Sequence, residues 1–342
     1  MGVDLGELVP HTVLDLDELP KAKVAIDAYN ALYQFLTVIR QPNGTPLMNS
    51  KGQITSHLQG LFYRTISLLE LGLKPIYVFD GEIPALKKGE LVQRSLRRER
   101  AAIEAKNAYE SGQYDIAYKK SVQATKVNAQ IVAQAKELLG YMGIPIIDAP
   151  FEGEAQASKL VIDGQAYACA SQDYDALLFG SPRLLRNLTI TGKRKLPGKD
   201  QHVDVKPELI ELSKVLQVLG LTRSQLIELA ILIGTDYNPR GFPGIGPKTA
   251  YKLIKEYSVL KKVLEVKKLE PDFDVDAVIQ EFSEPKVTSN YQINWGAVNP
   301  EAIVNFLCEE QDFSRERVQS AINRLLVASR QSAQQSLEKW FS

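Results

Sequence analysis

Four short apolar segments in the first half of the chain each lead into acidic residues. The segments are 23–26, 75–79, 144–147 and 167–170, and helical patterns such as 53–71 and 127–142 separate them. Apolar runs of this length are typical of strands buried on both faces, and the helices between them serve as crossovers. The pattern therefore predicts an α/β fold with a mostly parallel central sheet flanked by helices.

The acidic residues that follow these segments are predicted to meet at one edge of the sheet, beyond the carboxyl ends of the strands, where open parallel sheets bind ligands. Clustered carboxylates either take up protons or bind cations. Oxygen ligands select hard ions, so we expect two Mg²⁺ ions, with Mn²⁺ as an alternative. The candidate metal ligands are Asp27, Asp80, Glu152, Glu154, Asp173, Asp175 and Asp236.

Each of these acids alone also fits a simpler role, because Asp and Glu commonly cap helices or lie on the surface. Their joint placement is what favours metal. The paired spacings Glu-Gly-Glu and Asp-Tyr-Asp suit two ions. Two such ions about 4 Å apart can activate a water and stabilise the leaving oxygen of a phosphodiester.

The charge of the chain is balanced overall but uneven locally. Lys+Arg and Asp+Glu both number 41, which taken alone argues weakly against nucleic-acid binding. Residues 87–100 nevertheless hold six basic and two acidic side chains, and further basic stretches occupy 183–199 and the region after Lys248. Such patches favour phosphate contact, although one patch alone also fits a solvated helix face. Residues 86–126 are highly charged and poor in large apolar side chains, which predicts exposed helix outside the core.

Several classes of protein are excluded by composition. Two cysteines provide no disulfide framework, and three dispersed histidines do not fit a Cys/His zinc site. No apolar run is long enough to span a membrane, and the first ten residues do not resemble a secretory signal.

A glycine-rich segment, 241–250, joins two helical patterns within residues 224–257. Glycines let a backbone approach a phosphate, and the following helix offers free N–H groups. The segment therefore suits a helix-hairpin-helix grip on DNA through Gly244, Gly246 and Lys248, without base reading. A nucleotide-binding P-loop is excluded because Pro247 stands where that motif requires glycine. A plain helix-helix turn without a ligand stays open.

Five short motifs, in order, resemble the flap endonucleases: residues 26–28, 78–81, 151–156, 171–175 and 234–237. The resemblance extends over the whole chain and fits the archaeal and eukaryotic members. It implies a 5′ nuclease (PIN-like) fold with a seven-stranded sheet, one nuclease core over about 1–330, and a helical arch over about 86–126. It also implies a monomeric nuclease.

The resemblance assigns roles to individual residues. Asp27, Asp80, Glu152 and Glu154 are similar to the set nearest one metal, and Asp173, Asp175 and Asp236 to the set nearest the other. Lys87 and Arg94 match the arch-base positions that reach the scissile phosphate. Tyr33 matches an aromatic that stacks on the base next to the cut, although a helix-core role is an equal alternative. The family hairpin also holds a monovalent cation, K⁺.

The last residues, 331–342, are predicted to form a flexible tail that binds the sliding clamp PCNA. Their pattern of Gln, aliphatic and two aromatic residues resembles a clamp-interacting peptide. A short helical turn would place the apolar residues on one face, which suits binding to a hydrophobic pocket. The chain has no long basic tail after this motif, which favours an archaeal, cytoplasmic and nucleoid-associated protein over a nuclear one. The residues that fill the motif are Gln334, Leu337, Trp340 and Phe341.

Together the residues and the resemblance predict a hydrolase that cuts 5′ flaps at their junction with duplex DNA. The resemblance adds a 5′-3′ exonuclease activity and roles in Okazaki-fragment maturation and base-excision repair. Two alternatives stay open: another member of the 5′ nuclease superfamily, and a clamp-bound DNA adaptor without catalytic activity. The adaptor predicts loss of at least one of the seven acids, and all seven are present.

Overall fold

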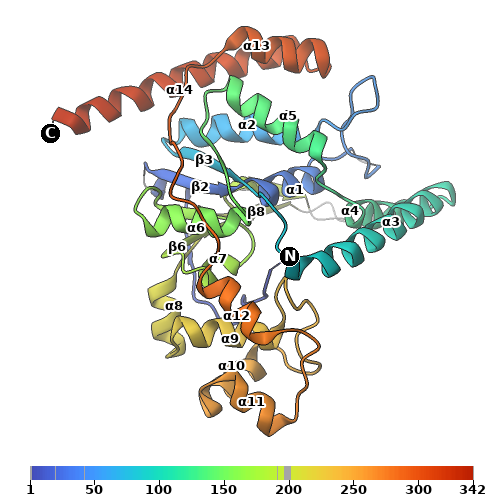
Figure 1. The fold of residues 1–342 in the computed structure, drawn as a ribbon. Coiled ribbons are helices and arrows are strands. Elements are labelled where there is room, and N and C mark those ends of the chain that lie inside the picture. The colour runs from blue at the N-terminus through green and yellow to red at the C-terminus, as the bar shows by residue number, and fades with distance from the viewer. Residues whose placement is uncertain (1, 20, 42, 191, 196–201, 342) are drawn as a thin grey trace.

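A seven-stranded mixed sheet forms the centre of the described chain (Figure 1). The computed structural model describes residues 2–341 except 20, 42, 191 and 196–201, and the side chains of 193–195, 202–203 and 331–341 are outside that description. In spatial order the strands are β1 (Thr12–Val13), β9 (Glu208–Glu211), β6 (Arg183–Arg186), β5 (Ala168–Ala170), β2 (Lys23–Asp27), β3 (Lys74–Phe79) and β4 (Ile146–Asp148).

The five strands from β6 to β4 run parallel, and β9 pairs antiparallel with both β6 and β1. This confirms the predicted mostly parallel sheet with seven strands. The four strands expected from apolar runs are all present, each within two residues of its predicted start. Their central residues are buried on both faces, which is why they lack the polar alternation of a half-exposed strand.

Helices cover both faces of the sheet (Figure 1). Alternate strand residues point to opposite faces, so Val24 and Ile26 belong to one hydrophobic core and Ala25 to the other. One face carries α1 (Ala28–Val38), α2 (Ser56–Glu70), α5 (Ala129–Tyr141), α13 (Pro300–Val304) and α14 (Arg315–Phe341). The other carries α6 (Gly153–Ile162), α7 (Asp175–Leu178), α8 (Leu212–Leu219), α9 (Arg223–Ile233), α10 (Pro247–Tyr257), α11 (Leu260–Lys267) and α12 (Val275–Ser283).

Two helices project from one side of the molecule, α3 (Lys88–Glu110) and α4 (Tyr114–Gln123) (Figure 1). They pack mainly on each other, and their buried residues are Ala101, Ala108 and Ala117. Ile103 is 63% exposed. The prediction that this charged segment is helical and contributes little to the core is therefore correct.

The segment before α8 is extended and not helical. Residues His202–Val205 (β8) pair antiparallel with Gly192–Lys195 (β7) in a separate two-stranded sheet, and β9 joins the main sheet before α8 begins. Burial explains β9, since Ile210 is 1% exposed and points into one core while its neighbour Leu209 packs against the other.

Helix α14 continues to Phe341, so the backbone of the predicted tail is helical up to that residue. The side chains of Gln334, Leu337, Trp340 and Phe341 lie outside the described part of the chain. Their role in clamp binding therefore stays a prediction. No single helix among the described residues is long and apolar enough to cross a membrane.

Candidate active site

The seven acidic residues converge at the carboxyl edge of the sheet. Asp27 ends β2, and Asp80 follows β3 directly. Glu152 and Glu154 stand at the start of α6, which packs on β2, β3 and β5. The chain returns to the same edge twice more, first with Asp173 after β5 and Asp175 as the first residue of α7, and then with Asp236 just after α9.

Backbone N–H groups hold four of these carboxylates in place. Asp27 caps α1 and accepts the N–H of Asn30 at 3.0 Å. The other three accept N–H groups from distant segments: Asp80 from Gly153 at 2.6 Å, Glu154 from Ala176 at 3.0 Å, and Asp175 from Val3 at 2.9 Å. Gly2 lies so close to Asp175 that an added Cβ would be 2.4 Å from Oδ1. The site therefore joins segments that are far apart in sequence.

Burial and mutual repulsion favour the protonated forms of these acids. Burial, and then the charge of Asp80, raise the pKa of Asp27 to about 8. Burial and Asp236 raise the pKa of Asp175 to about 7. Burial and Asp175 also raise the pKa of Glu154 well above its usual value. Asp80 is exposed to solvent on one side. Desolvation by the surrounding protein, and then the charge of Glu152, nevertheless raise the pKa of Asp80 to about 6. Positive charge close to such a cluster favours the ionised acids.

Cationic side chains from the base of the arch face the same acids. Lys87 Nζ lies 2.6 Å from Glu152 Oε1 and 3.6 Å from Asp236 Oδ2, and Arg94 Nη2 lies 3.2 Å from Asp236 Oδ1. Burial lowers the pKa of Lys87, but the two acids raise it more, so this amine stays charged. Burial raises the pKa of Asp236, and nearby positive charge, chiefly that of Lys87, brings it below its usual value.

The donor set fits divalent metal. All seven acids offer oxygen, which Mg²⁺ and Mn²⁺ prefer, and the pKa values of four of them are raised by burial first and by the charge of neighbouring acids second. In the described part of the chain, no three His, Cys, Asp or Glu side chains are close enough to hold one ion.

Two residues at the site were not found from the sequence. Tyr237 donates its hydroxyl to Glu152, and the Lys87 amine lies 4.6 Å from the centre of the Tyr237 ring. Asn30 donates from Nδ2 to Asp173 Oδ2 at 3.2 Å. The available signals were weak: Tyr237 adjoins a candidate ligand, and Asn30 lies three residues after another. Both contacts depend on long-range folding.

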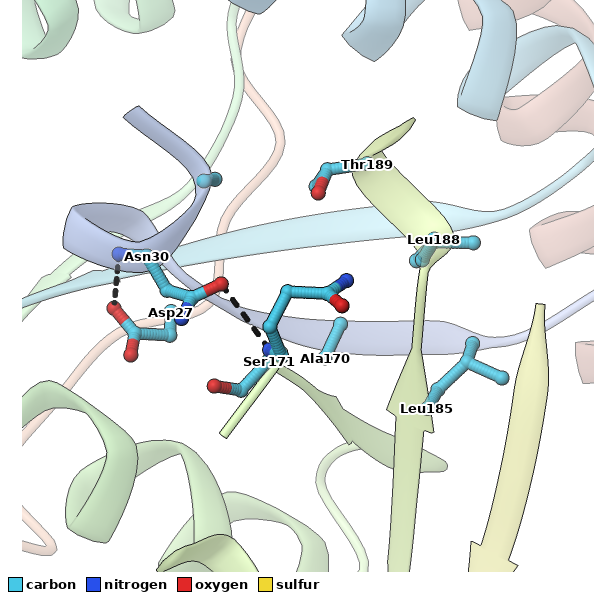
Figure 2. Close-up of a pocket in the computed structure, with 9 residues that line it drawn as sticks. Asp27, Asn30, Ala170, Ser171, Leu185, Leu188 and Thr189 are labelled. Atoms are coloured by element: carbon cyan, nitrogen blue, oxygen red, sulfur yellow. Dashed lines mark hydrogen bonds between the residues drawn. The ribbon is translucent and has the colours of Figure 1, made fainter. Parts of the chain in front are cut away.

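Figure 2 shows a small pocket beside Asp27, between α1 and the ends of β5 and β6. Apolar side chains, among them Leu185 and Leu188, form one wall, and Asn30 and Thr189 supply polar groups.

Tyr33, the predicted stacking residue, lies half-buried on α1, and its side chain is close enough to interact electrostatically with Arg98 of α3.

The predicted hairpin joins α9 and α10. Gly246 caps α10, and Pro247 occupies its first turn, where no N–H is required. Gly244 has a φ of +79°, and nothing lies within 4 Å of where a Cβ would stand, so this turn is open to solvent. Lys248 is exposed and pairs with Glu7 at 3.2 Å. A glycine turn, a helix N-terminus and an accessible lysine are thus grouped on one surface.

The basic stretch 183–199 is partly used within the fold. Arg183 donates to the carbonyl of Tyr167 at 2.6 Å, and Arg186 pairs with Glu208 at 3.0 Å. These two arginines tie β6 to its neighbours, so they are not a free phosphate-binding patch. The side chains of 193–195 and the residues 196–201 are outside the described part.

Comparison with known proteins identifies the family. Residues 5–101 match the XPG N-terminal domain and residues 143–236 the XPG I-region. Flap endonuclease 1 of Pyrococcus abyssi is 54% identical over 341 residues, covering 100% of this chain and 98% of the relative, and that of Pyrococcus furiosus is 53% identical over 100% and 99%.

Solved structures of similar proteins support the same family. Flap endonuclease-1 from Methanococcus jannaschii superposes with a TM-score of 0.76 and 42% identity, over 96% of this chain and 98% of that one. The catalytic core of Rad2 in complex with DNA substrate shares the fold, with a TM-score of 0.70 and 24% identity over 95% and 100%. The chain therefore belongs to the flap endonuclease 1 family, a family of metal-dependent, structure-specific 5′ nucleases.

Proposed function

We propose that this nuclease uses the seven-carboxylate site to cut DNA at the junction of a 5′ single-stranded flap with duplex, and that it also degrades DNA exonucleolytically from the 5′ end. The observation that supports this most is the meeting of seven acids with Lys87 and Arg94 at one sheet edge. An adaptor without catalytic activity has no use for so costly a concentration of charge, and we set that alternative aside.

Two Mg²⁺ ions, or Mn²⁺ in their place, would be held by Asp27, Asp80, Glu152 and Glu154 on one side and by Asp173, Asp175 and Asp236 on the other. When bound, these ions supply positive charge that activates a water and stabilises the leaving oxygen. The carboxylates of Asp27, Asp80, Glu154 and Asp175 each accept a backbone N–H from another residue, and these hydrogen bonds hold them in place.

Lys87 and Arg94 are proposed to stabilise the extra negative charge on the scissile phosphate. In the free protein both contact Asp236, and Lys87 also contacts Glu152. With metal held by these acids, Lys87 and Arg94 would be available to the phosphate. Lys87 and Arg94 stand at the start of α3, which is the first helix of the arch. We propose that the flap passes under this arch.

The remaining DNA contacts are proposed for the hairpin and α1. Gly244, Gly246 and Lys248 would grip the phosphates of the downstream duplex, and the hairpin carbonyls would hold K⁺. Tyr33 would stack on the base next to the cut, which its half-exposed ring allows. These contacts use backbone and ring faces, so they would read DNA shape and not sequence.

The cellular setting is proposed from the sequence pattern. Gln334, Leu337, Trp340 and Phe341 would dock a monomeric nuclease on the clamp PCNA, in the cytoplasm of an archaeal cell, during Okazaki-fragment maturation and base-excision repair. Removal of residues 334–342 should leave basal cleavage unchanged and abolish stimulation by the clamp. Stimulation that survives the truncation would place the main docking surface elsewhere.

The reaction is tested with a labelled double-flap DNA, in Mg²⁺ and in EDTA. A single product cut at the flap junction, seen only with Mg²⁺, supports the proposed reaction. A matched duplex without a flap, of the same sequence, checks that structure is what the enzyme recognises. Binding of the DNA without cleavage in Mg²⁺ would contradict the proposed reaction and favour the alternative of a DNA adaptor without catalytic activity.

A further inference from the structure

Asn30 lies between the two sets of carboxylates. Its backbone N–H donates to Asp27 Oδ1 at 3.0 Å, and its side-chain Nδ2 donates to Asp173 Oδ2 at 3.2 Å. Asp27 belongs to one proposed ligand set and Asp173 to the other. Figure 2 shows Asn30 reaching from α1 both to Asp27 and to the segment that follows Ala170. One residue thus contacts an acid of each set.

A chain of hydrogen bonds fixes which end of the Asn30 amide faces Asp173. The Thr189 hydroxyl donates to Gln34 Oε1, so the Nε2 of that glutamine donates in turn to Asn30 Oδ1 at 2.6 Å. The N–H of Gln172 donates to the same Oδ1 at 3.1 Å. Because Oδ1 accepts from two donors, the amide nitrogen must face Asp173.

The surroundings make this chain of hydrogen bonds stiff. Gln34 lies one helical turn after Asn30 on the same face of α1, and it is 8% exposed. Ala31, Leu185 and Leu188 line the adjoining pocket and limit competing water. Hydrogen bonds are stronger in such a low-dielectric setting, and a broken one is correspondingly costly.

We propose that Asn30 is a positioning residue that sets the separation between the two carboxylate sets, and thereby the affinity of the site for divalent metal. Its donors lie against two like charges that otherwise repel each other. The inference rests on the proposed function in one respect, since it takes Asp27 and Asp173 as metal ligands. Outer hydrogen bonds to ligating carboxylates typically change metal affinity by about 10–100-fold.

Direct binding of Mn²⁺ to the full chain without DNA, followed by electron paramagnetic resonance, tests the proposal. Asn30→Leu keeps the side-chain size and removes the amide, so Mn²⁺ should bind about tenfold more weakly. Gln34→Leu leaves Asn30 in place but removes one of the two donors that hold its Oδ1, and it should weaken binding about threefold. Asn290→Leu, at an exposed position of the segment between α12 and α13, is the matched control and should bind as the unaltered chain does.

Thermal unfolding in EDTA separates positioning from loss of fold. A folded Asn30→Leu chain with weakened Mn²⁺ binding supports the proposal, and a folded one that binds Mn²⁺ normally overturns it. If Asn30→Leu does not fold, the same measurement on Gln34→Leu takes its place: weakened Mn²⁺ binding supports the proposal, and normal binding overturns it. Asp173→Asn tests the metal assignment separately. Unchanged Mn²⁺ binding in Asp173→Asn would contradict the proposed set of metal ligands. Weakened binding in Asp173→Asn, together with normal binding in Asn30→Leu and Gln34→Leu, would contradict only the role of Asn30.

Discussion

The carboxylate site and the arch carry opposite charges and are built in opposite ways. At the site, Asp27, Glu154 and Asp175 are at most 9% exposed, and each accepts a backbone N–H. In the arch, Ile103 is 63% exposed and Tyr114 60%. The acids are thus fixed by the core, whereas the cations stand on helices that the core hardly supports. The charge that we propose to bind metal thus has a rigid frame, and the charge that we propose to receive a flap has an accessible one.

Removal of one fixed acid should have the largest effect. Asp175→Ala deletes a buried carboxylate that contacts the N–H of Val3, and we expect cleavage to fall by at least about 10³-fold. Flap binding should persist, because it depends mostly on phosphate contacts elsewhere. Single-turnover cleavage and a binding isotherm in Ca²⁺ measure the two quantities. Cleavage near the level of the unaltered enzyme would defeat the assignment of Asp175 to metal.

The framework of this site was predictable from sequence because its signals are local. Each apolar run followed by an acid defines a buried strand and its carboxyl end, and Asp27 and Asp80 stand where that logic places them. Contacts across the chain were not predictable. Asn30 and Asp173 are 143 positions apart, and Arg186 reads as a free cation until its pairing with Glu208 is seen. Strand β9 was missed for the same reason, since its partners are distant.

Removal of an arch cation should separate catalysis from metal binding. Lys87→Met keeps much of the side-chain bulk and deletes the charge beside Glu152 and Asp236. We expect cleavage to fall by about 10²–10³-fold, as for loss of a transition-state donor. Mn²⁺ should bind more tightly, because a competing cation is gone. Weaker Mn²⁺ binding in Lys87→Met would show that the lysine organises the acids and does not compete with metal for them.

The raised pKa values of the fixed acids predict how metal stabilises the fold at different pH. A carboxyl group whose folded pKa lies above its unfolded value favours folding below about pH 4 and loses that contribution as pH rises through the folded pKa. For Asp80, Asp175 and Asp27 this window covers about pH 6 to about pH 8. Metal replaces the proton, so stabilisation by Mg²⁺ should grow across the window.

The unfolding temperature, measured with Mg²⁺ and with EDTA, should therefore differ by about 3 °C more at about pH 8.5 than at about pH 5.5. Asp27→Asn removes the acid with the highest of these three pKa values and should flatten the dependence. A difference that stays constant with pH would mean that the acids are already ionised in the metal-free fold.

The smallest expected effect concerns the stability of the arch itself. Leu138→Ala in α5 empties a fully buried position and should lower the free energy of unfolding by about 2–5 kcal/mol. Ile103→Ala in α3 removes a comparable side chain that already meets water, and we expect a change within about 0.5 kcal/mol. Chemical denaturation of both variants provides the comparison. A large loss for Ile103→Ala would show that the arch is fastened to the core, and the contrast between a rigid site and a loosely supported arch would then fail.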